Sequence, residues 1–179
     1  MPNEDLMIID DFADPARASS GARWELYTDQ VMGGISRGAI AWETVAGRTA
    51  LHVRGGVLLD NNGGFVQASL DLSADGGPIN VSEFAGVEAT VIGNNERYNV
   101  HVRTTDTKRP WQSYRQSFKA SEVWQTVRLP FIDFTPHRID TPLDLSCLRR
   151  ISFVAIGREF EADLSVSHLA FFRAPSSHV

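Results

Sequence analysis

Two glycine pairs, each beside polar residues and a large aromatic side chain, constrain this chain more than any other feature. The segment WELYTDQVMGGISRG covers residues 24–38, and NNGGF covers residues 61–65. Glycine reaches positive φ at little cost and lets another backbone come close, so both segments predict loops with demanding geometry. We expect the two loops to meet at one end of the fold. Their candidate residues are Asp29, Met32, Gly33, Gly34, Ser36, Asn61, Asn62, Gly63 and Gly64.

Period-two alternation of apolar and polar residues dominates the rest of the chain. It is clearest in residues 51–54, 87–91, 98–103 and 160–166. This pattern is typical of half-buried strands, and the frequent turn signals between the runs leave room for only short helical turns, at 82–85 and 143–148. The sequence therefore predicts an all-β fold, an antiparallel β-sandwich of jelly-roll type. We expect one domain over residues 1–174 and a flexible tail over 175–179.

Composition excludes several classes of partner. The chain has 179 residues and a formal net charge of −5, which disfavours a nucleic acid or an anionic membrane held by bulk electrostatics. No apolar run approaches the roughly 20 residues of a membrane helix, so we expect no membrane insertion. Cys147 is the single cysteine and cannot form an intrachain disulfide. Because Glu4, Asp5 and Asp10 precede any basic residue, a leader is not expected and the predicted location is cytoplasmic.

Catalytic and cofactor motifs are missing from the sequence. The five histidines are scattered, and neither a Gly-x-Ser-x-Gly elbow nor a zinc-ligand spacing occurs. The glycine pairs lack the strand-to-helix context of a nucleotide loop. We therefore expect no catalytic residue, no metal and no cofactor. A structural calcium is the alternative, with Asp10, Asp11, Asp60 and Asn61 as oxygen donors, but these residue types also form Asx turns, which we favour.

One predicted sheet face combines polar and aromatic side chains. If the strand over residues 98–103 pairs with the next one, alternate residues gather opposite Val100 and Val102. The candidates are Asn99, His101, Arg103, Trp111, Tyr114 and Gln116. Rings that stack on sugars and planar groups that bind hydroxyls would suit a carbohydrate site, and Trp, Tyr and Arg are equally enriched in protein-binding hot spots. An ordinary solvated face is the third interpretation.

Several motifs identify a family resemblance. The glycine segments match Trp, then Asp-x-Val-Met-Gly-Gly-x-Ser, and Asn-Asn-Gly-Gly-Phe, and residues 97–98, 124 and 129–131 follow in the family's order. In these residues the chain resembles the complex I intermediate-associated protein 30 family, an assembly-factor domain of NADH:ubiquinone oxidoreductase, and a compact, bacterial-type member of it. It departs from the family at Val66-Gln67 and at 93–97, where Gly-Asn-Asn-Glu-Arg replaces a Gly-Asp-Gly-Arg turn.

The resemblance implies a galactose-binding-domain-like fold and a non-enzymatic function. The implied role is a binding or scaffolding module that works through protein-protein contacts, with subunits or intermediates of respiratory complex I as the expected partners. The alternative is a module that binds a carbohydrate or another small ligand on the same fold.

Overall fold

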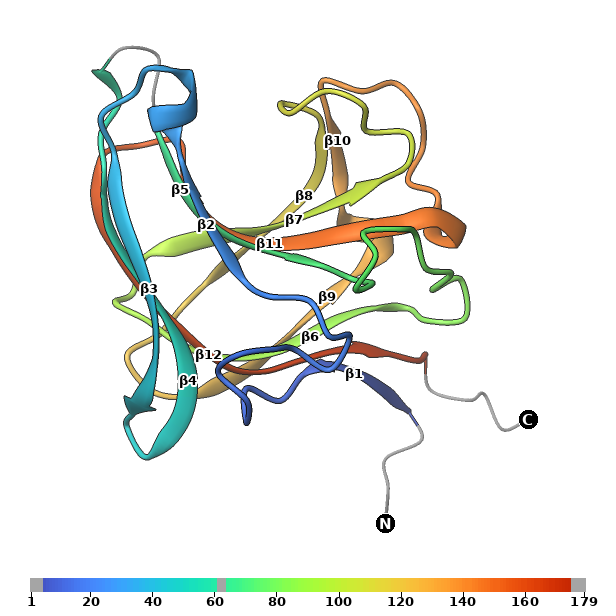
Figure 1. Cartoon of the computed structure of the whole chain (residues 1–179), viewed down its shortest axis with the longest axis horizontal. Coiled ribbons are helices and arrows are strands. Elements are labelled where there is room, and N and C mark those ends of the chain that lie inside the picture. The colour runs from blue at the N-terminus through green and yellow to red at the C-terminus, as the bar shows by residue number, and fades with distance from the viewer. Residues whose placement is uncertain (1–4, 61–63, 175–179) are drawn as a thin grey trace.

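The computed structural model describes residues 5–60 and 64–174, which form two antiparallel sheets packed face to face (Figure 1). Sheet A has, in spatial order, β3 (Arg37–Val45), β4 (Arg48–Val57), β12 (Phe160–Phe172), β6 (Gly86–Ile92) and β9 (Gln125–Pro130), with β1 (Leu6–Asp10) also paired to β12. Sheet B has β10 (Thr135–His137), β8 (Ser113–Lys119), β7 (Arg97–Thr104), β11 (Leu148–Ile156), β5 (Phe65–Asp71) and β2 (Glu25–Thr28). Short 3-10 helices are η1 (Asp29–Met32), η3 (Phe131–Asp133) and η4 (Leu145–Cys147). The predicted all-β sandwich is confirmed.

The core lies between the inner faces of the two sheets. Alternate residues of β7, from Tyr98 through Val100 to Val102, are buried against sheet A, as the period-two pattern predicts. Trp24 closes one end of this core, where its ring lies 5.9 Å from that of Phe12 in a stacked arrangement. Apolar burial of this extent is the main force that holds the sheets together.

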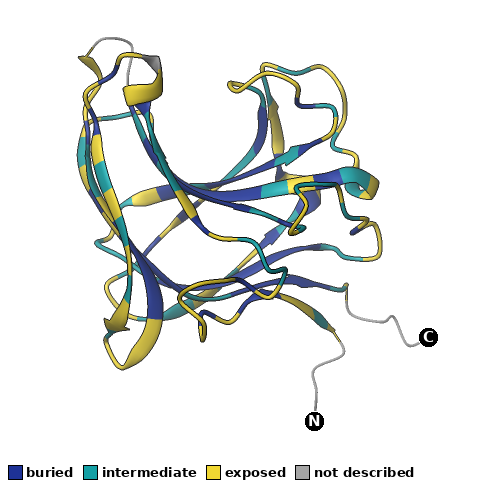
Figure 2. Ribbon diagram, in the orientation of Figure 1, coloured by how far each residue is buried: buried dark blue, intermediate teal, exposed yellow. Residues whose placement is uncertain are grey.

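Sheet B curves so that its outer face is hollow. In Figure 1, β7 and β11 cross the middle of the molecule, β2, β5 and η1 rise on the left, and β8 and β10 rise on the right. Figure 2 shows buried positions concentrated along β7, β11, β6 and β12, whereas the loops above sheet B are largely exposed. The two edges of sheet B therefore rise on either side of its outer face (Figure 1).

The two helical turns expected from the sequence are short in the structure. The helical turn expected at 143–148 is the 3-10 helix η4, and residues 82–83 form a turn. Within residues 5–60 and 64–174, no helix is long and apolar enough to cross a membrane. The expected tail at 175–179 lies outside the described residues, as do Asn61, Asn62 and Gly63.

Two of the calcium candidates, Asp10 and Asp11, serve as turn formers. Asp10 accepts hydrogen bonds from Phe12 N at 2.7 Å and from Trp24 Nε1 at 2.8 Å, and Asp11 accepts one from Ala13 N at 3.0 Å. The bonds from Phe12 N and Ala13 N are the Asx-turn contacts expected of such residues, whereas the bond from Trp24 ties Asp10 to a core side chain. Asn61 lies outside the description.

Candidate functional site

The two glycine loops meet at the buried carboxylate of Asp29, the first residue of η1. It accepts hydrogen bonds from Ser36 N at 2.9 Å and Phe65 N at 3.1 Å, and from Ser36 Oγ and Gly64 N. Burial alone would raise the pKa of Asp29, but these hydrogen bonds outweigh it and hold the pKa below 3.8. Asp29 therefore fixes one loop to the other as a carboxylate.

The first glycine pair provides space for this carboxylate. A Cβ on Gly34 would lie 2.4 Å from Asp29 Oδ1, so only glycine fits. Gly33 instead adopts φ of 85° and ends η1 in the left-handed region, immediately after Met32. The two glycines thus have different tasks, steric for Gly34 and conformational for Gly33.

A cleft of about 730 Å³ occupies the hollow face of sheet B, next to the joined loops. One wall carries Tyr27 and Phe65, from β2 and β5, and Trp111 lies in the wall formed by the loop between β7 and β8. Trp111 is 51% exposed, which is unusual for so large a side chain. This volume is in the range of small-ligand pockets, and aromatic walls are typical of them.

Cross-strand pairs on β7, β8 and β11 build the floor of the cleft. His101 lies opposite Arg115 on one side and Ser152 on the other, and Arg103 lies opposite Arg150. Burial, with help from the positive charge of Arg115, lowers the pKa of His101 to about 3, so its imidazole is neutral at physiological pH.

The structure brings three of the predicted patch residues together in the cleft: His101, Arg103 and Trp111. Asn99 has the same strand parity but lies further along β7, outside the residues that line the cleft. Whether any of these residues binds a ligand remains a prediction.

Tyr114 and Gln116 do not belong to this face, and the predicted placement was wrong. Tyr114 lies opposite Val102 and Gln116 opposite Val100, so both share the parity of the core. Tyr114 is fully buried and its hydroxyl donates to Thr141 O at 2.5 Å, while Gln116 Nε2 donates to Pro130 O at 2.9 Å. Cross-strand neighbours point to the same side of a sheet, and that side here is the inside.

Arg103 anchors the loop that carries Trp111. Its guanidinium donates to the carbonyl oxygens of Thr107 at 2.9 Å, Pro110 at 3.0 Å and Gln112 at 3.4 Å. Burial and the nearby charge of Arg150 lower the pKa of Arg103, but a guanidinium stays charged at physiological pH. Arg103 therefore positions the aromatic wall.

Sequence reasoning missed several cleft residues, among them Tyr27, Phe65, Arg115 and Arg150. A signal was present for Arg115, because Tyr114 and Phe118 are apolar at i and i+4, which assigns the odd-numbered residues of that strand to the outer face. No comparable signal existed for Tyr27 and Arg150, whose meeting depends on the order of strands in sheet B.

The cleft offers binding groups and no obvious catalytic arrangement. In the part of the chain that the structure describes, neither cleft histidine, His101 or His137, hydrogen-bonds a serine or cysteine side chain. Across the same residues, the one group of three possible metal ligands is Asp106, Asp144 and Cys147. The site presents aromatic rings, guanidinium groups, imidazoles, amides and hydroxyls.

Solved structures with the same architecture include carbohydrate-binding modules. The family 11 module of the cellulosomal cellulase Lic26A-Cel5E of Clostridium thermocellum superposes with a TM-score of 0.75 and 14% identity over 97% of this chain and 98% of that one. A family 11 module from Clostridium thermocellum in complex with a β-1,3-1,4-mixed-linked tetrasaccharide gives a TM-score of 0.70 and 15% identity over 94% and 96%.

A further similar structure is the family 30 module of the cellulase Cel9D-Cel44B of Clostridium thermocellum, with a TM-score of 0.56 and 14% identity over 79% of this chain and 93% of that one. At such identities the likeness shows a shared fold, the jelly-roll sandwich expected from the sequence. Among curated proteins, none matches this sequence.

The family described as Complex I intermediate-associated protein 30 (CIA30) matches residues 11–166, which include both glycine loops, Asp29 and the whole cleft floor. This chain therefore belongs to the complex I intermediate-associated protein 30 family.

Proposed function

We propose that this chain is a non-enzymatic binding module that acts in the assembly of a respiratory complex. It holds a segment of a partner protein in the cleft of sheet B, and the expected partners are subunits or assembly intermediates of complex I. The observation that carries the proposal is the open cleft of about 730 Å³, with Trp111 exposed in one wall. Family membership supports the assembly role.

The loops beside the cleft suit a binding surface that exists before its ligand arrives. Asp29 ties the loop before β3 to the start of β5, and Arg103 ties the loop before β8 to the sheet. A surface fixed in this way loses little conformational entropy on binding. Val31 and Leu59, both exposed, add apolar area along the wall that Asp29 supports.

The test is affinity capture from the native host under a moderate salt wash, with three forms of the full chain. Unchanged protein should recover complex I subunits, and Trp111→Ala should lose most of them. Ile132→Ala is the matched control, because Ile132 is 91% exposed on η3 and outside the cleft. Recovery that is equal for all three forms would refute binding in the cleft.

A carbohydrate ligand is the second candidate function. Tyr27, Phe65 and Trp111 place aromatic rings around one cleft, and rings of this kind stack on sugar C–H faces. The similar structures include a module in complex with a mixed-linked tetrasaccharide. Calorimetry with that tetrasaccharide tests the idea: saturable binding that Trp111→Ala removes would favour the sugar, and no heat at millimolar concentration would count against it.

A further inference from the structure

The charge of the cleft is opposite to the charge of the whole protein. Among the described residues, its lining contains four arginines, at positions 103, 115, 138 and 150, and no aspartate or glutamate, although the formal net charge of the chain is −5. A concave surface lined by one sign of charge raises the local concentration of counter-ions. The cleft is thus a positive region in an acidic protein.

This concentration of charge places like charges side by side. Arg103 lies directly opposite Arg150 across β7 and β11, an arrangement that destabilises a sheet. The positive charge of Arg138 also lies near enough to Arg115 to lower its pKa, after the larger effect of burial. An anion bound between these guanidinium groups would relieve the repulsion.

Contacts within the protein satisfy two of the four arginines, Arg150 and Arg103. Arg150 Nε donates to Asp71 Oδ1 at 2.8 Å, and Arg103 is occupied by loop carbonyls. Arg115 donates through Nε to Ser113 Oγ at 2.9 Å. Within the described residues, neither Arg115 nor Arg138 has a carboxylate within ion-pair distance.

The surroundings of Arg115 and Arg138 favour a bound anion. His101, the cross-strand neighbour of Arg115, is 7% exposed and its Nε2 makes no hydrogen bond, so a buried polar atom beside Arg115 is left without a partner. Arg138 follows β10 with φ of 56°, a costly conformation for a residue other than glycine, and its carbonyl is held by Gln112 Nε2 at 3.1 Å. Backbone strain of this kind persists only where surrounding contacts hold the residue, so the position of Arg138 is fixed.

We propose that Arg115 and Arg138 form an oxyanion subsite at the β8–β10 end of the cleft, which binds a carboxylate or phosphate group of the ligand. The guanidinium of arginine offers paired donors that fit the two oxygens of such a group. The proposal rests on the proposed function in that it concerns the same cleft, and it adds that the occupant is anionic. In a partner protein this chemistry is an acidic segment, and in a saccharide it is a uronate.

The experiment is calorimetric titration of the full chain with charged and uncharged probes in pairs. The probes are pentaglutamate against pentaglutamine, trigalacturonate against the neutral mixed-linked tetrasaccharide, and inorganic phosphate alone. We expect at least one oxyanion probe to bind at millimolar or lower concentration, its uncharged counterpart to bind at least about tenfold more weakly, and affinity to fall as salt rises. The probe that binds best identifies the source of the anion.

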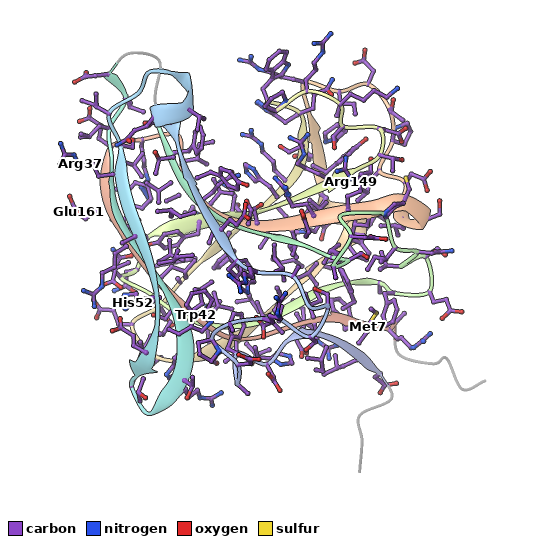
Figure 3. All side chains as sticks on the ribbon, viewed as in Figure 1. Met7, Arg37, Trp42, His52, Arg149 and Glu161 are labelled. Atoms are coloured by element: carbon purple, nitrogen blue, oxygen red, sulfur yellow. The ribbon has the colours of Figure 1, made fainter. Side chains whose placement is uncertain are left out.

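Variants connect the binding to the two arginines. Arg115→Gln and Arg138→Gln should each weaken the oxyanion probe by about tenfold. Arg138 is exposed, so its variant tests the subsite even if Arg115→Gln alters the fold. Arg54→Gln is the matched control, because Arg54 is an exposed residue of β4 on sheet A and does not line the cleft. Figure 3 labels His52, two positions before it, at the lower left of the molecule.

The outcomes separate this proposal from the proposed function. If no oxyanion probe binds the folded protein, or if both arginine variants bind as well as Arg54→Gln does, the subsite is refuted. Partner capture that needs Trp111 but neither arginine would leave the assembly role intact and remove the anionic occupant. Conversely, arginine-dependent binding of an oxyanion without any captured partner would keep the subsite and refute the assembly role.

Discussion

The carboxylate of Asp29 accepts a hydrogen bond from the backbone N–H of Phe65 at 3.1 Å, across 36 positions of the chain. Phe65 begins β5 and lines the cleft, whereas Asp29 begins η1 on the preceding loop. One buried side chain therefore positions an aromatic residue in the wall of the cleft. Gly34 and Gly64, one from each glycine segment, both lie against this carboxylate.

Replacing Asp29 should test how much the junction stabilises the fold. Asp29→Asn keeps the size of the side chain but turns an NH2 group toward donors, so we expect a loss of about 2–4 kcal/mol in the free energy of unfolding. Urea denaturation measures it. Asp75→Asn is the control, because the exposed Asp75 carboxylate also accepts a backbone N–H, from Gly77 at 2.8 Å, and we expect little change. Equal losses in the two variants would contradict the role given to Asp29.

The two glycines of the first pair should respond differently to alanine. Gly34→Ala places a Cβ against the Asp29 carboxylate and should cost more than about 2 kcal/mol. Gly33→Ala has open space around its Cβ and should cost about 1 kcal/mol, the strain of a left-handed alanine. Gly47→Ala, with φ of 83° and equally open space, is the reference for strain alone. Thermal unfolding of the three variants gives the order.

Acid should destabilise the protein through His101. Its pKa is about 3 in the folded protein and near 6.5 when unfolded, so between these values the unfolded chain binds a proton that the folded chain does not. Stability is full above pH 6.5 and falls as pH drops toward 3, by at most about 1.4 kcal/mol per pH unit. Denaturation at pH 7, 6 and 5 measures the slope, which His101→Leu should flatten. An unchanged slope in that variant would show that other groups cause it.

Trp111 and Tyr114 should separate binding from stability. Trp111→Ala removes an exposed ring and should leave the melting temperature nearly unchanged while weakening ligand or partner binding by at least about tenfold. Tyr114→Ala empties a fully buried site and removes the hydrogen bond to Thr141, so it should cost about 3–5 kcal/mol. Melting curves and a binding assay on both variants decide the matter. A stable Tyr114→Ala that loses binding would return Tyr114 to the site.

Prediction from the sequence succeeded where the signal was local. Alternation around Val100 and Val102 indicated a half-buried strand, and that strand is β7. The glycine pairs indicated unusual loops, and Gly33 and Gly34 have the conformational and steric roles that such pairs suggest. It failed at β8, because the pattern-based prediction placed Tyr114 and Gln116 on the outer face, whereas both share the side of the strand on which Phe118 packs into the core.

The sequence by itself determined that this chain forms a β-sandwich with two special loops, because period-two patterning and the backbone freedom of glycine are properties of neighbouring residues. Only the tertiary structure decided which side chains share the cleft. Register brings Arg115 opposite His101, and strand order brings β2 and β5 beside β11, so Tyr27 and Arg150 meet. A shift of one residue in register reverses every side chain on a strand, and no local pattern specifies which distant strand will be its partner.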